Sequence, residues 1–226
     1  MNSQQKGFTL VEIAIVLVII GLLLGGVLKG QELINSAKVK NFANDFRNIP
    51  LFIYGYQDKF KALPGDDAGV VAHISSGTQA TTPTSSQGNG VIDGNWDSTT
   101  ATDESVVFWQ HVRLAGLASG NTVVSVAATG NTYWPTNADG GRIGIESGSA
   151  HLIKNTDNTT FLQGSYVVCS QGILGKFAKQ LDTTMDDGNT DSGSMRVVAT
   201  NHTRGNVALA RANVDDATSY IVCMGL

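Results

Sequence analysis

The segment KGFTLVEIAIVLVIIGLLLGGVL, residues 6–28, sets the organisation of the whole chain. From Phe8 to Leu28 every residue is apolar, glycine or threonine, with the single exception of Glu12. As a helix, this run would reach about 30 Å, which is the thickness of a bilayer core. A secretory signal peptide would have a shorter apolar region followed by a small-residue cleavage site, whereas here Lys29 follows directly. We therefore expect residues 8–30 to form a transmembrane anchor that stays in the mature chain.

Glu12 is the exception that this anchor must accommodate. A carboxylate near the middle of a bilayer costs roughly 2.5–3.5 kcal/mol on insertion scales. Either the carboxylate is simply tolerated near the membrane edge, or it meets a positive charge inside an apolar assembly. Two small-xxx-small pairs in the same run, Gly21/Gly25 and Gly26/Gly30, would allow close helix contact, or they make this stretch flexible.

The stretch after the anchor predicts that the helix continues and becomes amphipathic. Apolar residues recur there at alternating spacings of three and four, with charged and polar residues on the other faces. Pro50 interrupts the pattern without changing its phase, which predicts a kink rather than an end. The helix, residues 31–63 in this half, is expected to stop at Leu63-Pro64-Gly65, where turn residues follow. The apolar stripe consists of Val39, Phe42, Phe46, Ile49, Ile53, Tyr56 and Phe60.

Residues 64–226 are long enough for one domain with its own core, and their pattern predicts an α+β fold. Helices are expected over 103–118, with Asp103 as N-cap and Gly120 beyond the end, and over 171–181. Residues 75–86, rich in serine and threonine, predict an exposed loop that is either bare or glycosylated. Strands are expected near 122–128, 142–145, 161–168, 195–200, 206–211 and 219–224.

Composition argues against several classes of function. The net charge is −4 and the pI is near 5.5, so no basic field indicates a nucleic-acid partner. The four histidines are scattered, and no HExxH pair, CxxC, phosphate loop or GxSxG elbow is present. His111 is expected to bond backbone groups, and the three tryptophans are expected to pack the core. We therefore do not expect an enzyme.

Two cysteines each lie at the end of an apolar, strand-like run. Cys169 follows Ser165-Tyr-Val-Val, and Cys223 follows Tyr220-Ile-Val. A disulfide between them is the natural reading in an oxidising compartment, with two buried free thiols as the alternative. A disulfide would place the domain outside the cytoplasm. Lysines lie on both sides of the anchor, and their balance mildly favours a cytoplasmic C-terminus. A disulfide would be stronger evidence about topology than this lysine balance.

Two acidic loops are candidate calcium sites. The first offers Asp93, Asn95, Asp97 and Glu104 at positions 1, 3, 5 and 12 of a calcium loop. However, Ser98 stands where the sharp turn needs glycine, and Glu104 also suits the first turn of a helix. The second loop gathers four carboxylates in ten residues without EF-hand order. Its alternative is a solvated turn held by Asx hydrogen bonds. The four are Asp182, Asp186, Asp187 and Asp191.

The segment Lys6-Gly7-Phe8-Thr9-Leu10-Val11-Glu12 resembles the leader junction, of class III, found in type IV pilins and the pseudopilins of type II secretion. The resemblance implies a leader at 1–7, cleavage between Gly7 and Phe8 by a prepilin peptidase, and methylation of the new Phe8 amine. It also implies that Glu12 pairs with the Phe8 amine of a neighbouring subunit, which would fix the axial stagger of a filament. Pilins commonly have a proline within the anchor, and this chain has none before Pro50. Pilus and pseudopilus therefore both remain open.

The resemblance implies a pilin-like fold in which the long helix packs on an antiparallel sheet. The implied function is that of a structural subunit of a type IV pilus or pseudopilus. The alternative is a membrane-tethered adhesin or exported enzyme that uses a pilin-like anchor. The implied partners are other pilin subunits, prepilin peptidase and the inner-membrane assembly platform. We expect a single-pass protein of the bacterial inner membrane whose domain lies outside the cytoplasm, and a periplasmic or extracellular filament after assembly. No cofactor is expected apart from calcium, which some major pseudopilins hold near the second acidic loop.

Overall fold

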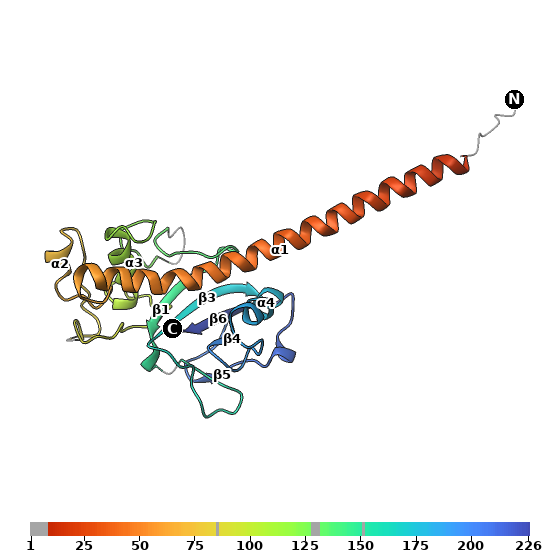
Figure 1. The fold of residues 1–226 in the computed structure, drawn as a ribbon. Helices are drawn as coiled ribbons and strands as arrows, with labels where there is room; N and C mark the ends of the chain where they lie inside the picture. The colour runs from red at the N-terminus through yellow and green to blue at the C-terminus, as the bar shows by residue number, and fades with distance from the viewer. Residues whose placement is uncertain (1–8, 85, 128–131, 151) are drawn as a thin grey trace. The chain divides into compact units, whose positions relative to one another are not determined.

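A computed structural model describes residues 9–84, 86–127, 132–150 and 152–226 (Figure 1). The chain divides into two compact units, Met1–Lys38 and Val39–Leu226. In chain order the elements are α1 (Leu10–Phe60), α2 (Val70–His73), α3 (Glu104–Leu114), β1 (Ile143–Ser147), η1 (Gly148–Ala150), β2 (Ile153–Lys154), β3 (Tyr166–Leu174), α4 (Gly175–Met185), β4 (Met195–Ala199), β5 (Asn206–Val207), η2 (Arg211–Asn213) and β6 (Ser219–Gly225).

The described part of the first unit is helical from Leu10 onward, and its apolar side chains are exposed. Leucines, isoleucines and valines between Leu10 and Leu28 each leave about half or more of their surface uncovered. Within the described residues, α1 is the helix that is long and apolar enough to cross a membrane, judged by length and composition. The expected anchor therefore forms as a helix.

In the second unit, the C-terminal part of α1 is buried along the predicted stripe. Phe42, Phe46, Ile53 and Tyr56 are all almost fully covered. Pro50 lies inside the helix, as its position in the unbroken pattern predicted. The helix ends at Phe60, three residues earlier than expected. Lys61 follows in the left-handed region, with φ 56°.

The main sheet has the strand order β1-β3-β6-β4, and all of its pairs are antiparallel. Because side chains alternate across a strand, the sheet has two apolar faces. One face, with Ile145, Val168 and Val222, shares a core with the buried stripe of α1. The other face, with Val198 and Ile221, packs against a second apolar cluster. The α+β, pilin-like fold is thus confirmed.

Several element boundaries differ from expectation because tertiary pairing overrides local pattern. β3 begins only at Tyr166 and continues to Leu174, where it pairs with β6 across a register shift. The helix expected over 171–181 therefore starts at Gly175. β5 covers only Asn206–Val207 of the strand expected over 206–211, and it pairs with β2, which was not predicted.

Two predictions around α3 were also wrong. Residues 122–127 form no strand, and the Thr122 carbonyl accepts a hydrogen bond from the Gln110 side chain instead. Residue 128 lies outside the described residues. The helix expected to reach residue 118 ends at Leu114, and Gly116, with φ 78°, follows this end. A glycine in this conformation stops a helix without steric cost.

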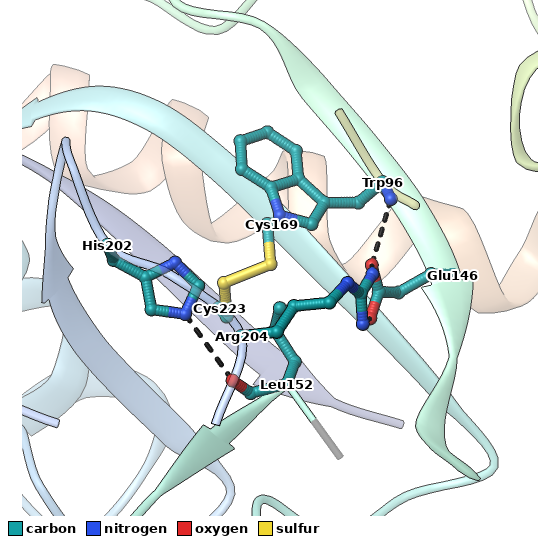
Figure 2. The surroundings of a disulfide bond; sticks show 7 residues. All are labelled: Trp96, Glu146, Leu152, Cys169, His202, Arg204 and Cys223. Carbon is teal, nitrogen blue, oxygen red and sulfur yellow. Dashed lines mark hydrogen bonds and ion pairs between the residues drawn. A yellow bond between two sulfur atoms is a disulfide. The ribbon is translucent and has the colours of Figure 1, made fainter. Parts of the chain in front are cut away.

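The predicted disulfide is present and joins neighbouring strands. Cys169 of β3 lies directly opposite Cys223 of β6 in the antiparallel register. Both residues are fully buried in the second apolar cluster, which also contains Trp96 and Leu152 (Figure 2). The bridge therefore ties the last strand of the chain to the centre of the sheet.

We predict that losing this bridge destabilises the domain strongly. The cysteines are 54 residues apart, and closing a loop of that length is worth about 4 kcal/mol in the chain-entropy model. Replacing both cysteines by alanine should therefore lower the unfolding midpoint of the full chain in detergent by about 10 °C. The measurement is thermal unfolding followed by circular dichroism. Finding two free thiols by alkylation of the natively exported protein would contradict the bridge.

Candidate functional site

The first turn of α1 contains a capping box formed by Thr9 and Glu12. The Glu12 Oε2 atom accepts hydrogen bonds of 2.8 Å from both the backbone N–H and the hydroxyl of Thr9. In return, the Glu12 N–H donates to the Thr9 hydroxyl at 3.2 Å. This reciprocal arrangement satisfies N–H groups that have no partner inside a helix. Glu12 thus has a local role that the sequence analysis missed, although the spacing Thr-x-x-Glu signals it. Gly7 and Phe8 lie outside the described residues.

Between Ile13 and Leu28, every residue of α1 is apolar or glycine and is exposed. Apart from the neighbouring backbone of α1 itself, no described atom lies within 4 Å of the place where a side chain would begin at the four glycines of the small-xxx-small pairs. Their neighbours Leu17, Leu22 and Leu24 are each more than half exposed. An apolar surface this long is covered in the cell by lipid or by other protein, because leaving it in water costs free energy in proportion to its area.

The long helix and the antiparallel sheet give the chain a pilin-like α+β fold. Residues 2–28 match the prokaryotic N-terminal methylation motif, which is the class III leader of type IV pilins and pseudopilins. No curated protein and no solved structure matches the chain. Proteins with this motif are processed by prepilin peptidase and assemble with other pilins. The motif and the apolar helix together indicate a structural subunit that is anchored in a membrane before assembly.

The second acidic loop brings three of its four carboxylates together. Asp182, in the last turns of α4, has oxygen atoms within 4.8 Å of those of Asp186 and Asp187. Asp186 also accepts hydrogen bonds from the Met195 N–H and the Ser194 hydroxyl. Among the described residues this is the group with the spacing of a metal site. Asp191 is not part of it and accepts a hydrogen bond from Thr156 at 2.7 Å.

Asp182 is the unusual member of this cluster. Its side chain is fully buried, and neither carboxylate oxygen meets hydrogen-bond geometry with any group in the described chain. Burial and the neighbouring carboxylates of Asp186 and Asp187 raise its pKa to about 7, and the Gly188 N–H and Arg211 offset this only partly. A buried acceptor without a partner is expensive, so the Asp182 carboxylate favours binding a proton or a positive charge.

The acids of the first loop are not grouped with the spacing of a metal site among the described residues. Glu104 is buried, and its two oxygens accept hydrogen bonds from the Asp93 N–H and the Ser86 hydroxyl. Asn95 and Asp97 are exposed, and no three acidic groups of this loop meet among the residues described. Glu104 lies in the first turn of α3, which was the alternative to a calcium ligand in the sequence analysis.

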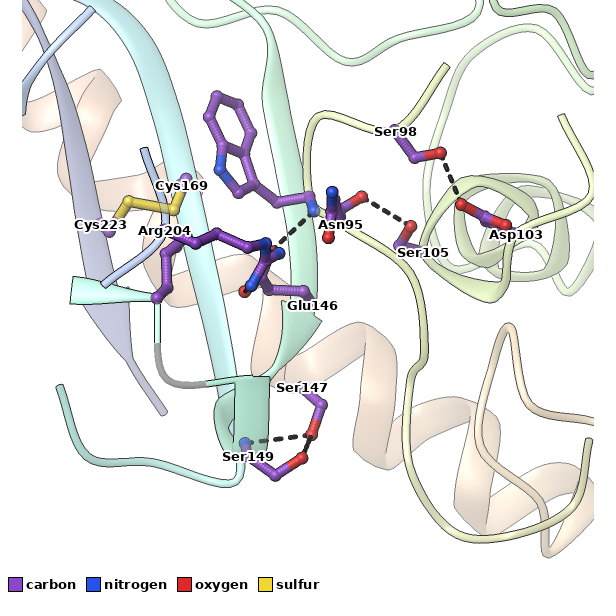
Figure 3. Close-up of polar contacts among 12 residues, drawn as sticks. Asn95, Ser98, Asp103, Ser105, Glu146, Ser147, Ser149, Cys169, Arg204 and Cys223 are labelled. Atoms are coloured by element: carbon purple, nitrogen blue, oxygen red, sulfur yellow. Dashed lines mark hydrogen bonds and ion pairs between the residues drawn. A yellow bond between two sulfur atoms is a disulfide. The ribbon is translucent and has the colours of Figure 1, made fainter. Parts of the chain in front are cut away.

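Asp103 occupies the N-cap position of α3, but its side chain makes no capping hydrogen bond to the backbone of the helix. Its carboxylate instead accepts a hydrogen bond from the Ser98 hydroxyl at 2.6 Å (Figure 3). It also accepts one from the Thr82 hydroxyl. The expected capping bond is therefore absent, because the carboxylate ties two loop segments together.

A polar network that the sequence analysis missed fixes the loop after α1. The Asp66 carboxylate accepts hydrogen bonds from the backbone N–H groups of Gly88, Asn89 and Gly90. The Asp67 carboxylate accepts from the Tyr56 hydroxyl at 2.8 Å, and lies 2.7 Å from Nδ1 of His73. Both carboxylates are buried. The available signal was the pair of acids directly after the Leu-Pro-Gly helix stop.

His111 joins the same region to α3. Its Nδ1 accepts a hydrogen bond from the Gly65 N–H at 3.0 Å, and its Nε2 donates to the Thr78 carbonyl at 2.8 Å. These bonds assign the proton to Nε2. Burial lowers the pKa of His111, which favours this neutral form. The expectation that His111 serves backbone groups is confirmed.

An ion pair between a buried glutamate and a partly exposed arginine fixes the side of the sheet that carries the disulfide. Glu146 of β1 is fully buried and pairs through both oxygens with Arg204, and it also accepts the Trp96 N–H at 2.9 Å (Figures 2 and 3). Trp96 belongs to the same apolar cluster as the disulfide. This arrangement anchors the loop that carries Trp96 against the sheet.

Proposed function

We propose that this protein is the structural subunit of a type IV pilus or a pilus-like pseudopilus. The observation that carries the proposal is the methylation motif at residues 2–28, which runs into an apolar helix whose side chains the described chain leaves uncovered. In this scheme prepilin peptidase cuts between Gly7 and Phe8 and methylates the Phe8 amine. The helix anchors the subunit in the bacterial inner membrane, with the domain outside the cytoplasm, until an assembly platform transfers it into a filament.

The charge on Glu12 supports assembly by self-association. Cleavage creates a positive amine on Phe8, and the Glu12 carboxylate of a neighbouring subunit can neutralise it only at the correct axial stagger. Both charges are costly alone in an apolar core, so their pairing selects one register. Among the described residues, the capping box uses only the Oε2 atom of Glu12, so the carboxylate can cap the helix and meet a partner at the same time.

Processing provides the direct test of this proposal. We predict that the mature protein begins with methylated Phe8, and that Gly7→Leu blocks maturation because the peptidase must fit a small residue before the cut. Mass spectrometry of the membrane-extracted protein distinguishes the two lengths. A mature-sized, unmethylated chain in the wild type, or normal maturation of the Gly7→Leu variant, would contradict it and favour a tethered adhesin or enzyme.

Two substitutions at Glu12 separate the charge from the cap. Glu12→Val removes both, whereas Glu12→Gln keeps a side chain that suits a capping box and removes only the charge. We predict that both variants insert in the membrane normally and that both lower the amount of subunit in sheared filaments at least tenfold. Immunoblots of the filament and membrane fractions measure this. If Glu12→Gln assembles like the wild type, the carboxylate serves the cap alone.

We further propose that the cluster of Asp182, Asp186 and Asp187 holds a divalent cation, with calcium as the best candidate. The observation that favours it is the buried Asp182 carboxylate, which faces two other carboxylates and has no donor within hydrogen-bond geometry. Carboxylate oxygens are the ligands that calcium prefers, and calcium tolerates irregular loop geometry. A bound ion would neutralise the repulsion and would join the end of α4 to the start of β4.

We predict that calcium stabilises the full chain in detergent and that Asp182→Asn abolishes the effect. A ligand at one hundred times its Kd stabilises by about 2.7 kcal/mol, which should raise the unfolding midpoint by several degrees relative to chelator. Asp191→Asn is the matched control, because Asp191 lies outside the cluster and its variant should respond like the wild type. Equal midpoints of the wild type in calcium and in chelator would rule out the site.

A further inference from the structure

The surface of the second unit contains two adjoining hollows that neither the proposed assembly nor the cation cluster uses. One, of about 550 Å³, lies beside residues 147–149 and 162–166. The other, of about 510 Å³, lies beside the end of α1 and residues 66–69. Tyr166 and Gly90 line both, so the two hollows form one groove, which we call the Tyr166 groove. Each hollow has the volume of a typical small-molecule site, roughly 300–1,000 Å³.

The walls of the Tyr166 groove are mostly glycine or polar. At Gly90, no described atom apart from its chain neighbours lies within 4 Å of the place where a side chain would begin. The hydroxyls of Ser147 and Ser149, in the first hollow, lie 2.8 Å apart (Figure 3). Sites for apolar ligands are lined mainly by hydrophobic and aromatic side chains. An apolar ligand therefore fits this groove poorly.

The charged side chains of the groove already have partners within the chain. The Asp66 carboxylate accepts three backbone N–H groups, and the Asp67 carboxylate accepts a hydroxyl and a backbone N–H. The Lys61 ammonium donates to the Asp58 carboxylate at 3.3 Å. A charge without a partner is what makes the binding of a counter-ion favourable. The groove therefore favours a neutral ligand.

The backbone of one wall is also paired. The N–H groups of Ser165 and Tyr166 donate to the Leu226 carbonyl, and the Gly148 N–H donates to the Ser165 carbonyl at 3.0 Å. A peptide that binds by strand addition needs an edge with unpaired backbone groups. Because these groups already have partners, the wall does not favour a peptide strand.

Uncharged side chains supply the hydrogen-bonding groups that remain. The side chains of Tyr166, Gln57 and Ser165 make no hydrogen bond to any described residue. Burial, and after it the neighbouring Tyr54 and Asp66, raise the pKa of Tyr166, so its hydroxyl keeps its proton at neutral pH. Hydroxyl and amide groups can each donate and accept. A matching ligand is therefore rich in groups that also do both.

We propose that the Tyr166 groove binds a neutral oligosaccharide. Sugar hydroxyls both donate and accept, as the free side chains of the groove do. One face of a sugar ring consists of C–H groups, which pack on an aromatic ring such as that of Tyr166. An oligosaccharide is also an elongated ligand, which suits two adjoining hollows. The proposal goes beyond filament assembly and does not depend on it.

Titration of the full chain with neutral trisaccharides provides the test. The probes are maltotriose, cellotriose and tri-N-acetylchitotriose, with triglycine as the peptide probe, in a detergent without a sugar headgroup. We expect at least one trisaccharide to bind saturably in ligand-observed NMR. Its Kd should be roughly 0.1–10 mM, because each hydroxyl exchanges a bond to water for one of similar strength. Triglycine should bind about tenfold more weakly or not at all, since the wall offers it no strand partner.

Two substitutions and a control locate the binding. Tyr166→Phe keeps the ring and removes the hydroxyl, and Gln57→Ala removes an amide. Each should weaken trisaccharide binding about two- to tenfold, the range for losing one hydrogen bond. Gln180→Ala, on α4 and outside the groove, should leave the Kd unchanged. The proposal is overturned if none of the three trisaccharides binds, if triglycine binds more tightly, or if neither Tyr166→Phe nor Gln57→Ala weakens binding.

Discussion

The packing of the apolar stripe of α1 on the sheet is the constraint on which the globular unit depends. Phe42, Phe46 and Ile49 share one core with the inward-facing residues of all four strands of the main sheet. Burying side chains of this size is worth roughly 1.5–3 kcal/mol each. The stripe therefore orients the sheet and fixes where α3 can pack. The same helix leaves its N-terminal residues uncovered, and these are the residues that the methylation motif occupies.

Much of the domain outside the sheet has no regular secondary structure. Buried carboxylates there accept hydrogen bonds from backbone N–H groups, which in a sheet would pair with a neighbouring strand. Asp66 collects three backbone N–H groups, and Glu146 binds Arg204 and the backbone of Trp96. A loop is stable in such a place only when its backbone groups find partners. Asp182 breaks this rule, because it is as deeply buried as Glu146, but no side chain of the described residues, Arg211 included, makes a hydrogen bond to its carboxylate. This contrast gives the cation proposal its physical basis.

In the proposed filament, Glu12 would serve both the free subunit and the assembly. Within the chain it completes the first turn of α1 through Thr9, which reduces the cost of starting a helix inside an apolar environment. Its charge exceeds what a cap requires, since glutamine would suit the same geometry. The proposed filament gives this charge a use, because the Phe8 amine of a neighbouring subunit would neutralise it.

The sequence alone determined the features that depend on neighbours along the chain. The apolar run, the stripe after it and the strand-like surroundings of Cys169 and Cys223 have a period or a composition that local geometry imposes. Tertiary structure alone decided which distant groups meet. The spacing of the acids could not show that Asp182 is buried with Asp186 and Asp187 while Asp191 turns to Thr156. Nor could it show that Arg204 reaches Glu146, 58 positions away, or that Gln57 and Tyr166 line one groove. These encounters depend on strand register and loop closure, which are set by the packing of the whole core and not by any local pattern.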